Sequence, residues 1–300
     1  MSLISVGTVA IDNIKTAQGW KRNLLGGSAS HFSMSAGLFT EVHLVSAIGK
    51  DFPKKHYDFL KNKGVDLSSV IESGGKTFAW DGEYKPENLN SAITLKTELG
   101  VLVGYKPQIT EKQRNIPNVF LANIGPDVQM AFLKLMKNPK FVGMDTMNLW
   151  INIMKPDVIK LMKKSDLFIS NDAEAKLITG ETNLIKAAKA LRKIGPKLVV
   201  VKKGEHGVLF YCDDFMFSFG AFPVDKVVDP TGAGDTFAGG LMGYLAKMKK
   251  INERTLRQAC VYATVLSSFN VEGYGLAKTA GLSMVEVDQR MKSYVKFITP

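Results

Sequence analysis

The run Asp-Pro-Thr-Gly-Ala-Gly-Asp-Thr-Phe at positions 229–237 constrains the fold of this chain more than any other stretch. Val227 and Val228 precede it as the end of an apolar strand, and residues 238–249 follow it with the pattern of a helix. A glycine-rich turn that opens a helix leaves backbone N–H groups without intrahelical partners at the positive end of the helix dipole. Such a turn predicts an anion site, and its glycines let the backbone approach a charged ligand.

Asp235 is the unexpected residue of this run, because it places a carboxylate where an anion should bind. A base that receives the proton of a hydroxyl beside a phosphoryl group would explain its position. The amides of Ala233, Gly234 and Asp235 would then stabilise charge on the transferred group, as an oxyanion hole does. The alternative is that Asp235 only caps the start of the helix.

Two better-known phosphate motifs do not fit. Gly232 and Gly234 match the first two glycines of the dinucleotide motif Gly-x-Gly-x-x-Gly, but Phe237 stands in the third position. The tripeptide Gly-Lys-Thr at 75–77 is similar to the end of a Walker A loop, but Val70 stands where that loop needs its first glycine. The sequence therefore supports neither a dinucleotide fold nor a P-loop.

Composition limits the classes of protein that remain. The chain has 300 residues, 45% of them hydrophobic and 22% charged, which is typical of one large globular domain with an insertion or of two domains. The net charge of +11 favours anionic ligands, but the lysines are scattered, so we expect no nucleic-acid partner. No apolar run approaches a membrane span, so we expect no membrane partner. Two isolated cysteines and a start without a basic segment predict a cytoplasmic location.

Strands and helices are expected to alternate along most of the chain. The predicted strands cover 3–7, 20–25, 41–48, 118–122, 141–144, 167–170 and 197–202, and a hairpin covers 208–219. The predicted helices cover 28–38, 53–63, 127–137, 155–164, 172–179, 183–193, 238–249, 253–269 and 284–293. This alternation predicts an α/β fold with a mostly parallel sheet that helices cover on both faces.

Polar residues follow several of these strands. Asp12 comes shortly after the first strand, and Asn123, Asp145 and Asn171 come directly after later ones. Because ligands of open α/β sheets bind beyond the carboxyl ends of the strands, this row predicts a cleft. Asp12 would accept a hydroxyl of the substrate there, and its alternative role is that of a turn aspartate.

Two further pairs of residues fit the nucleotide side of such a cleft. Asn171 and Glu174, one helical turn apart, present an amide and a carboxylate together, and their spacing is also that of a helix-capping box. Lys202 and Gly204 end a further strand with a basic residue and a glycine, which suits a phosphate or a ribose.

Residues 68–107 have a different residue pattern from the rest of the chain. Residues 77–84 alternate aromatic and polar side chains, and residues 91–99 again alternate. A β-rich insertion must cover its apolar face, either by closing over a substrate cleft or by pairing with a second copy. We therefore expect a homodimer formed through residues 72–105.

Three motifs that occur in a fixed order span nearly the whole chain. The first is Gly-Gly-Ser-Ala-Ser-His at 26–31, followed by Ile-Gly-Lys-Asp-Phe at 48–52; the others are Asn-Asp-Ala-Glu at 171–174 and the run at 229–240. Together they resemble the signatures of the ribokinase (PfkB) family of carbohydrate and nucleoside kinases. His31 departs from the family, which usually has Asn there, and Lys202 stands where many members have Thr or Ser.

The resemblance implies a ribokinase-like kinase domain over 1–300, with a β-sheet lid over 68–107 to which 13–26 would add. It implies transfer of the γ-phosphoryl group of ATP, with Mg²⁺, to a hydroxyl of a small molecule. The implied catalytic residues are Asp235, Gly232, Ala233 and Gly234; the substrate side has Asp12, Gly27, Ser28, His31 and Asn123; the nucleotide side has Asn171, Glu174, Lys202 and Gly204; and a monovalent cation such as K⁺ would bind at Asp229 and Thr231.

Three functions remain open at this point. The first is a sugar kinase. The second is a nucleoside kinase that holds the base beneath the aromatic residues of the lid. The third is a ligand-binding sensor that does not turn over, and the Gly-Ala-Gly-Asp sequence at 232–235 disfavours it, because a sensor has no use for a base.

Overall fold

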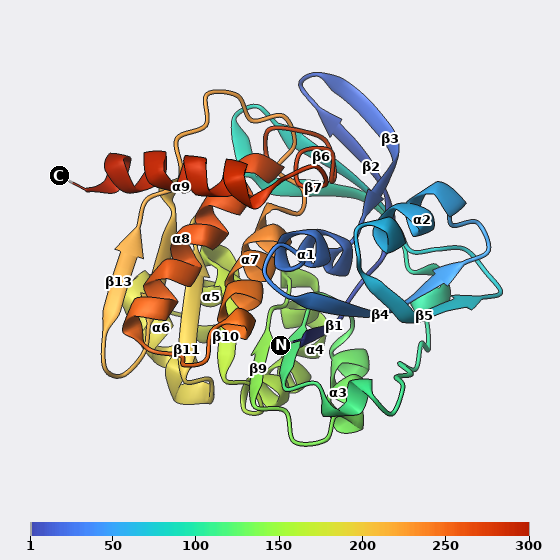
Figure 1. The fold of residues 1–300 in the computed structure, drawn as a ribbon, viewed down its shortest axis with the longest axis horizontal. Coiled ribbons are helices and arrows are strands. Elements are labelled where there is room, and N and C mark those ends of the chain that lie inside the picture. The colour runs from blue at the N-terminus through green and yellow to red at the C-terminus, as the bar shows by residue number, and fades with distance from the viewer. Residues whose placement is uncertain (1, 300) are drawn as a thin grey trace.

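The main sheet has nine strands within residues 2–299, the part of the chain that the computed structural model describes. In chain order they are β1 (Ser2–Val6), β4 (Glu41–Gly49), β5 (Asp66–Ser73), β8 (Asn118–Leu121), β9 (Phe141–Met144), β10 (Leu167–Asn171), β11 (Leu198–Lys202), β12 (Val208–Tyr211) and β13 (Met216–Phe219). In space they follow the order β13-β12-β11-β10-β9-β8-β1-β4-β5 (Figure 1). The strands from β11 to β5 pair in parallel, and β12 and β13 are antiparallel at one edge.

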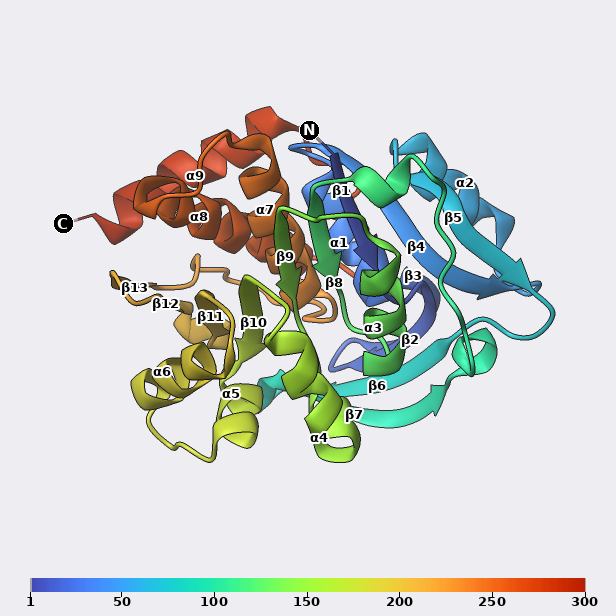
Figure 2. The ribbon, with the colours of Figure 1, turned by 90° about the horizontal axis from the view of Figure 1, so that it is seen from below.

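Helices cover both faces of this sheet, as Figure 2 shows from below. Within residues 2–299 the helices are α1 (Ser28–Ala36), α2 (Lys54–Asn62), α3 (Pro126–Leu135), α4 (Asn148–Met162), α5 (Asp172–Thr179), α6 (Leu184–Ile194), α7 (Ala233–Lys247), α8 (Glu253–Asn270) and α9 (Met284–Ile298). Alternate strand residues face opposite ways, so Leu3 packs in the cluster with α1, α7 and α8, and Ile4 packs in the cluster with α3 to α6. The predicted fold class is confirmed. No helix in the described part of the chain has both the length and the hydropathy for a membrane crossing.

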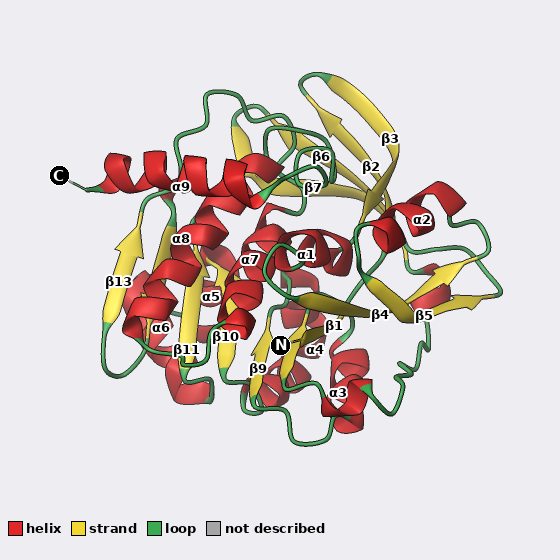
Figure 3. Cartoon of the chain, in the orientation of Figure 1, coloured by secondary structure: helices red, strands yellow, loops and turns green. Residues whose placement is uncertain are grey.

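A separate sheet of four strands stands beyond the carboxyl ends of the main sheet (Figure 3). Its order is β3-β2-β6-β7, with β2 (Ala10–Thr16), β3 (Gly19–Gly26), β6 (Ala79–Lys85) and β7 (Asn88–Glu98). β2 pairs in parallel with β6, and the other two pairings are antiparallel. The small sheet thus combines two segments, one close to the N-terminus and one within 68–107. Strand β5, which begins at Asp66, belongs to the main sheet instead.

Several elements differ from the sequence predictions, and α7, for example, begins at Ala233, five residues before the predicted start. β2 was not predicted, because Asp12 occupies a buried position of its alternation where an apolar side chain was expected. β5 was also missed, because serines interrupt its apolar pattern. Helix α4 begins at Asn148, seven residues before the predicted start, and contains Pro156. Pro favours the first turn of a helix, but here it lies inside α4, and the chain kinks at Met154, where φ is −136°.

Candidate active site

The glycine-rich run forms the turn that leads into α7. Gly232 has a φ of +75°, in the left-handed region that favours glycine, and the amide of Thr236 donates to its carbonyl oxygen (2.8 Å). The amide of Ala233 donates to the carbonyl of Pro230 at 3.1 Å, so it is already engaged. No partner for the Gly234 amide is found among residues 2–299. Of the predicted anion-binding amides, that of Gly234 is therefore the most available.

Asp235 lies in the first turn of α7, and its carboxyl has an unusual pKa. Loss of hydration raises this pKa to about 6, although the Lys202 ammonium and the residue's own backbone N–H both lower it. A carboxyl that changes charge close to neutral pH is suited to accept and release a proton. The predicted base therefore has an electrostatic environment that fits its role.

Asp229 ties the same turn to the loop after α8. Its carboxylate is completely buried and accepts the amides of Thr231 (2.9 Å) and Gly275 (3.1 Å). Burial raises its pKa, and these hydrogen bonds oppose the rise. Asp229 and Thr231, the two predicted cation ligands, therefore lie side by side and also hold the turn in shape.

Asn270, at the end of α8, is a site residue that the sequence analysis missed. Its side-chain oxygen accepts the hydroxyl of Thr236 (3.0 Å), and its amide nitrogen donates to the Thr231 carbonyl (2.8 Å). The same oxygen lies 3.0 Å from Nδ1 of His31. An asparagine near the end of a long helix carries no distinctive sequence signal, and only the fold brings it under the turn.

His31 extends from α1 to the underside of the anion turn. A Cβ atom at Gly232 would lie 2.2 Å from Nδ1 of the His31 ring, so ring and glycine are in direct contact. Burial lowers the His31 pKa to about 4, against the hydrogen bond with Asn270, and the ring is neutral at pH 7. Its Nε2 atom is buried without a partner in the described chain. Nε2 is thus the ring nitrogen that is left to accept a hydrogen bond.

Asp12 lies on β2, and the charge of Asp235 acts on its carboxyl. A Cβ at Gly26 would lie 1.8 Å from Oδ2 of Asp12, and the Gly27 amide donates to the carboxylate. Burial raises the Asp12 pKa to about 8, and the negative charges of Asp229 and Asp235 add to the rise. The predicted base is thus close enough to the predicted hydroxyl-binding carboxyl for its charge to raise the pKa of Asp12. Gly27 itself has a φ of +92°.

The remaining substrate-side residues are fixed by other protein groups. The Ser28 hydroxyl donates to the carbonyl of Asn123 (2.8 Å) and accepts the amide of Thr8 (3.1 Å). The side chain of Asn123 accepts the indole N–H of Trp150 (3.0 Å). These contacts connect the ends of three strands with α4. The part of α4 that orients Asn123 lies before the predicted start of this helix.

The nucleotide-side residues form a second group at the carboxyl ends of β9 to β11. Asn171 and Glu174 form a complete capping box, with 2.7 Å from the Glu174 amide to the Asn171 oxygen and 2.7 Å from the Asn171 amide to the Glu174 carboxylate. Asp145 is buried nearby, and its Oδ1 atom has no partner in residues 2–299. Burial raises the pKa of Glu174, the Lys202 ammonium opposes the rise, and Asp235 adds to it. The sequence placed Asp145 at this edge without giving it a role.

The small sheet contacts both groups of residues, the one around the turn before α7 and the one on the nucleotide side. The Tyr84 side chain of β6 lies beside that of Thr231. On β7, the Asn90 amide lies against Gly204, whose φ is +55° and whose Cβ, if present, would be 2.0 Å from the Asn90 oxygen. One small sheet therefore meets the anion turn and the loop after β11.

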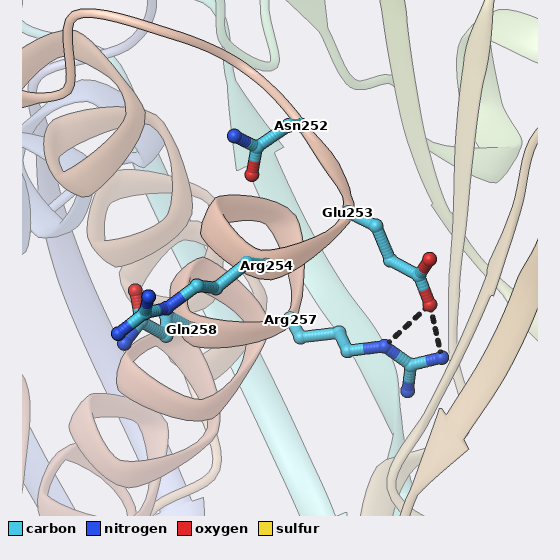
Figure 4. A pocket seen from close by; sticks show the side chains of 5 residues that line it. All are labelled: Asn252, Glu253, Arg254, Arg257 and Gln258. Carbon is cyan, nitrogen blue, oxygen red and sulfur yellow. Dashed lines mark hydrogen bonds and ion pairs between the residues drawn. The ribbon is translucent and has the colours of Figure 1, made fainter.

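A hollow of about 530 Å³ lies elsewhere, at the start of α8 (Figure 4). Arg257 and Glu253 form an ion pair there at 2.6 Å, and Arg254 points away from them toward Gln258. Asn270 is at the other end of this 18-residue helix, roughly 27 Å away at 1.5 Å per residue. The hollow is therefore not part of the site around Asp235.

Comparisons with known proteins show the family to which the chain is similar. The family model described as pfkB family carbohydrate kinase matches residues 115–280. A cytidine kinase of Thermococcus kodakarensis is 31% identical over 261 residues, which are 84% of this chain and 91% of that protein. The solved nucleoside kinase of Methanocaldococcus jannaschii has a TM-score of 0.76 at 20% identity, covering 97% of this chain and 98% of that one. A Burkholderia thailandensis nucleoside kinase in complex with inosine has a TM-score of 0.79 at 18% identity, covering 100% of both chains.

Fold, motifs and relatives together define a phosphotransferase that uses an alcohol group as acceptor. The chain belongs to the pfkB family of carbohydrate kinases. The resemblance that the three sequence motifs indicated is confirmed.

Proposed function

We propose that this kinase transfers the γ-phosphoryl group of ATP to a hydroxyl of a nucleoside. The observation that supports the site is that Asp12 of the small sheet lies near enough to the first turn of α7 for the negative charge of Asp235 to raise its pKa. The observation that supports a nucleoside is the 31% identity to a cytidine kinase over 84% of this chain. A β-sheet with Tyr84 on its covered face would enclose the acceptor.

The residues of the acceptor side have different roles in the proposed reaction. Asp12 accepts hydrogen bonds from hydroxyls of the ribose and fixes the reacting one, while Nε2 of His31 accepts a further hydroxyl. Asp235 receives the proton of the attacking oxygen, a form of assistance typically worth ~10²–10⁴ in rate. The Gly234 amide stabilises charge on the phosphoryl group. Gly232 and Ala233 shape the turn, and Gly27, Ser28 and Asn123 hold the strand ends in position.

The nucleotide side suits a phosphate-bound Mg²⁺. Mg²⁺ keeps much of its water and usually takes only one or two carboxylates from a protein. Asp145, with its unpartnered oxygen, and Glu174 offer two, and the described chain has no cluster of three ligands that would form a complete cage. When bound, Mg²⁺ would neutralise charge on the phosphates. Asn171 orients Glu174 through the capping box, and Gly204 leaves room beside the nucleotide.

Two further assignments belong to the same proposal. Asp229 and Thr231 would hold a monovalent cation such as K⁺ behind the anion turn, a role supported by the complete burial of the Asp229 carboxylate. The enzyme would work in the cytoplasm, which the two free, buried cysteines support, because disulfides are rare in a reducing compartment.

The second candidate is a sugar kinase, which the carbohydrate-kinase description of the matched family favours. A panel of acceptors separates the two. Release of ADP from Mg-ATP is measured with cytidine, inosine, ribose and fructose, and mass spectrometry identifies the phosphorylated product. We expect a kcat/KM at least tenfold higher for the best nucleoside than for either sugar. The reverse order would replace the nucleoside proposal by the sugar one.

A control removes the risk of a contaminating kinase. Asp235→Asn, purified in the same way, should lose the activity toward every acceptor of the panel. An activity that survives unchanged in this variant would not belong to the site described above.

A further inference from the structure

Lys202 is the last residue of β11, and its side chain crosses to the first turn of α7. A Cβ atom at Gly234 would lie 2.6 Å from the Lys202 Nζ atom. Gly234 does not have a positive φ, so its backbone conformation does not require glycine. The missing side chain instead leaves the space that the ammonium occupies. Lys202 therefore lies beside Gly234, at the same helix end that was predicted to bind an anion.

The ammonium of Lys202 interacts with several carboxyls of the site. Its ammonium lowers the pKa of three carboxyls, Asp145, Glu174 and Asp235, which belong to three different elements. It forms no ion pair with any of them within 4.0 Å in the described chain. An ammonium has three donors, so those of Lys202 remain free to bind the oxygens of a phosphate.

We propose that Lys202 is a catalytic residue that contacts the phosphoryl group during its transfer, in addition to holding the nucleotide. This inference rests on the proposed kinase function and assigns the side chain that contacts the phosphoryl group during transfer. Asp235 and Lys202 then act at the same turn, one on the proton and the other on the negative charge of the phosphoryl oxygens.

The transfer step balances with these two residues. The oxygen of the acceptor hydroxyl forms a bond to the γ-phosphorus, and the bond between that phosphorus and the bridging oxygen of ADP breaks. The bridging oxygen keeps the electron pair, and Asp235 takes the hydroxyl proton. Lys202 donates hydrogen bonds to the oxygens of the moving group and keeps its own protons throughout.

The test compares Lys202→Met with the wild-type enzyme. Methionine retains much of the length of the side chain but loses the charge. Removal of one donor to a developing charge typically lowers kcat by ~10²–10³. We expect a loss of that size, with the KM for ATP changed less than about fivefold, and a partial recovery in Lys202→Arg. Because the ammonium lowers the Asp235 pKa, the acidic limb of the kcat–pH profile should also move to higher pH in Lys202→Met.

Lys197→Met is the matched control, because it removes the same charge from the other end of β11, where Lys197 is 75% exposed. It should keep wild-type kcat and pH profile. Thermal midpoints of all variants show that each is folded. A Lys202→Met enzyme that keeps more than a third of kcat, or that loses only affinity for ATP, would overturn the proposal.

A binding measurement separates this inference from the choice of acceptor. Calorimetry gives the Kd of ADP alone and of ADP with aluminium fluoride, a mimic of the phosphoryl group in transfer, and transition-state mimics bind more tightly than ground-state ligands. Lys202→Met should bind ADP normally and lose the tightening by aluminium fluoride. This result would support Lys202 even if no nucleoside proved to be a substrate, and equal tightening in both enzymes would count against Lys202.

Discussion

Asp235 is the single residue on which the proposed chemistry depends most directly. Asp235→Asn keeps the size of the side chain but removes the proton acceptor, so kcat should fall by ~10²–10⁴. The Kd of the nucleotide should stay the same or decrease, because a negative charge near the phosphates is lost. Steady-state kinetics, calorimetry and the thermal midpoint on one preparation check the prediction. If Asp235 were only a helix cap, Asn would replace it well, and a folded variant would keep more than a tenth of kcat.

The acidity of the same residue predicts a pH dependence. The base must be ionised to act, and the Asp235 pKa is raised to about 6. The kcat of the wild-type enzyme should therefore fall as the pH drops below about 6, and the limb should be absent from the residual activity of Asp235→Asn. A kcat that is constant down to pH 5 would exclude Asp235 as the titrating base.

Asp12 predicts an effect on stability in addition to activity. Its pKa is raised from 3.8 to about 8, so between these values the folded chain holds a proton that the unfolded chain releases. Stability therefore falls as the pH rises through this window. Asp12→Asn removes the effect. The thermal midpoint of Asp12→Asn, relative to that of the wild type, should therefore rise from pH 5 to pH 8, while kcat/KM for the acceptor falls.

Differential scanning fluorimetry over this pH range measures the gain. Asp214→Asn, which changes an exposed aspartate on the turn between β12 and β13, is the control and should run parallel to the wild type. If the thermal midpoint of Asp12→Asn also changes with pH as that of the wild type does, the Asp12 carboxyl is not held in a site that disfavours its charge.

At the scale of elements, β7 forms an edge of the small sheet and exposes apolar side chains. β7 carries Ile93 and Leu95 with 46% and 47% of their surfaces exposed, and Val103 follows at 72%. We propose that two chains form a homodimer through residues 72–105, which would cover these side chains. Ile93→Lys with Leu95→Lys should therefore yield a monomer, measured by light scattering at micromolar concentration.

Two exposed apolar residues of α9 provide the control for the dimer. Val285 is 66% exposed and Phe297 62% exposed, and replacing both with lysine should leave the mass unchanged if the dimer forms through the small sheet. A wild-type chain that is monomeric with and without substrates would disprove the proposed assembly.

The elements also show how far the sequence could predict this molecule. Regular alternation predicted the main sheet and most of its helices, because buried parallel strands read as apolar runs. It failed at β2, because Asp12, a residue of the site, interrupts the strand pattern. Roles for the residues of the glycine-rich run at 229–237 could be predicted from their local chemistry and from the resemblance to a known family. Asn270 and Trp150 could not, since their importance depends on contacts with distant segments.

At the scale of the whole molecule, positive and negative charge are separated. The chain carries a net charge of +11, yet five carboxyl groups line one site: Asp12, Asp145, Glu174, Asp229 and Asp235. Lys202 is the cation that lowers the pKa of three of them. At long range the molecule attracts any polyanion, but at close range those carboxyls of the site that are ionised repel one.

We expect this arrangement of charge to make the enzyme select between ionic forms of its nucleotide. A bare triphosphate would be drawn to the surface and then meet the carboxylates, whereas a triphosphate that carries a divalent cation arrives with part of its charge already cancelled. Free ATP should therefore compete poorly with its metal chelate, and an excess of chelator should slow the enzyme by depleting the admitted species more than by blocking the site. The buried acids would then select among forms of one nucleotide before any bond is broken.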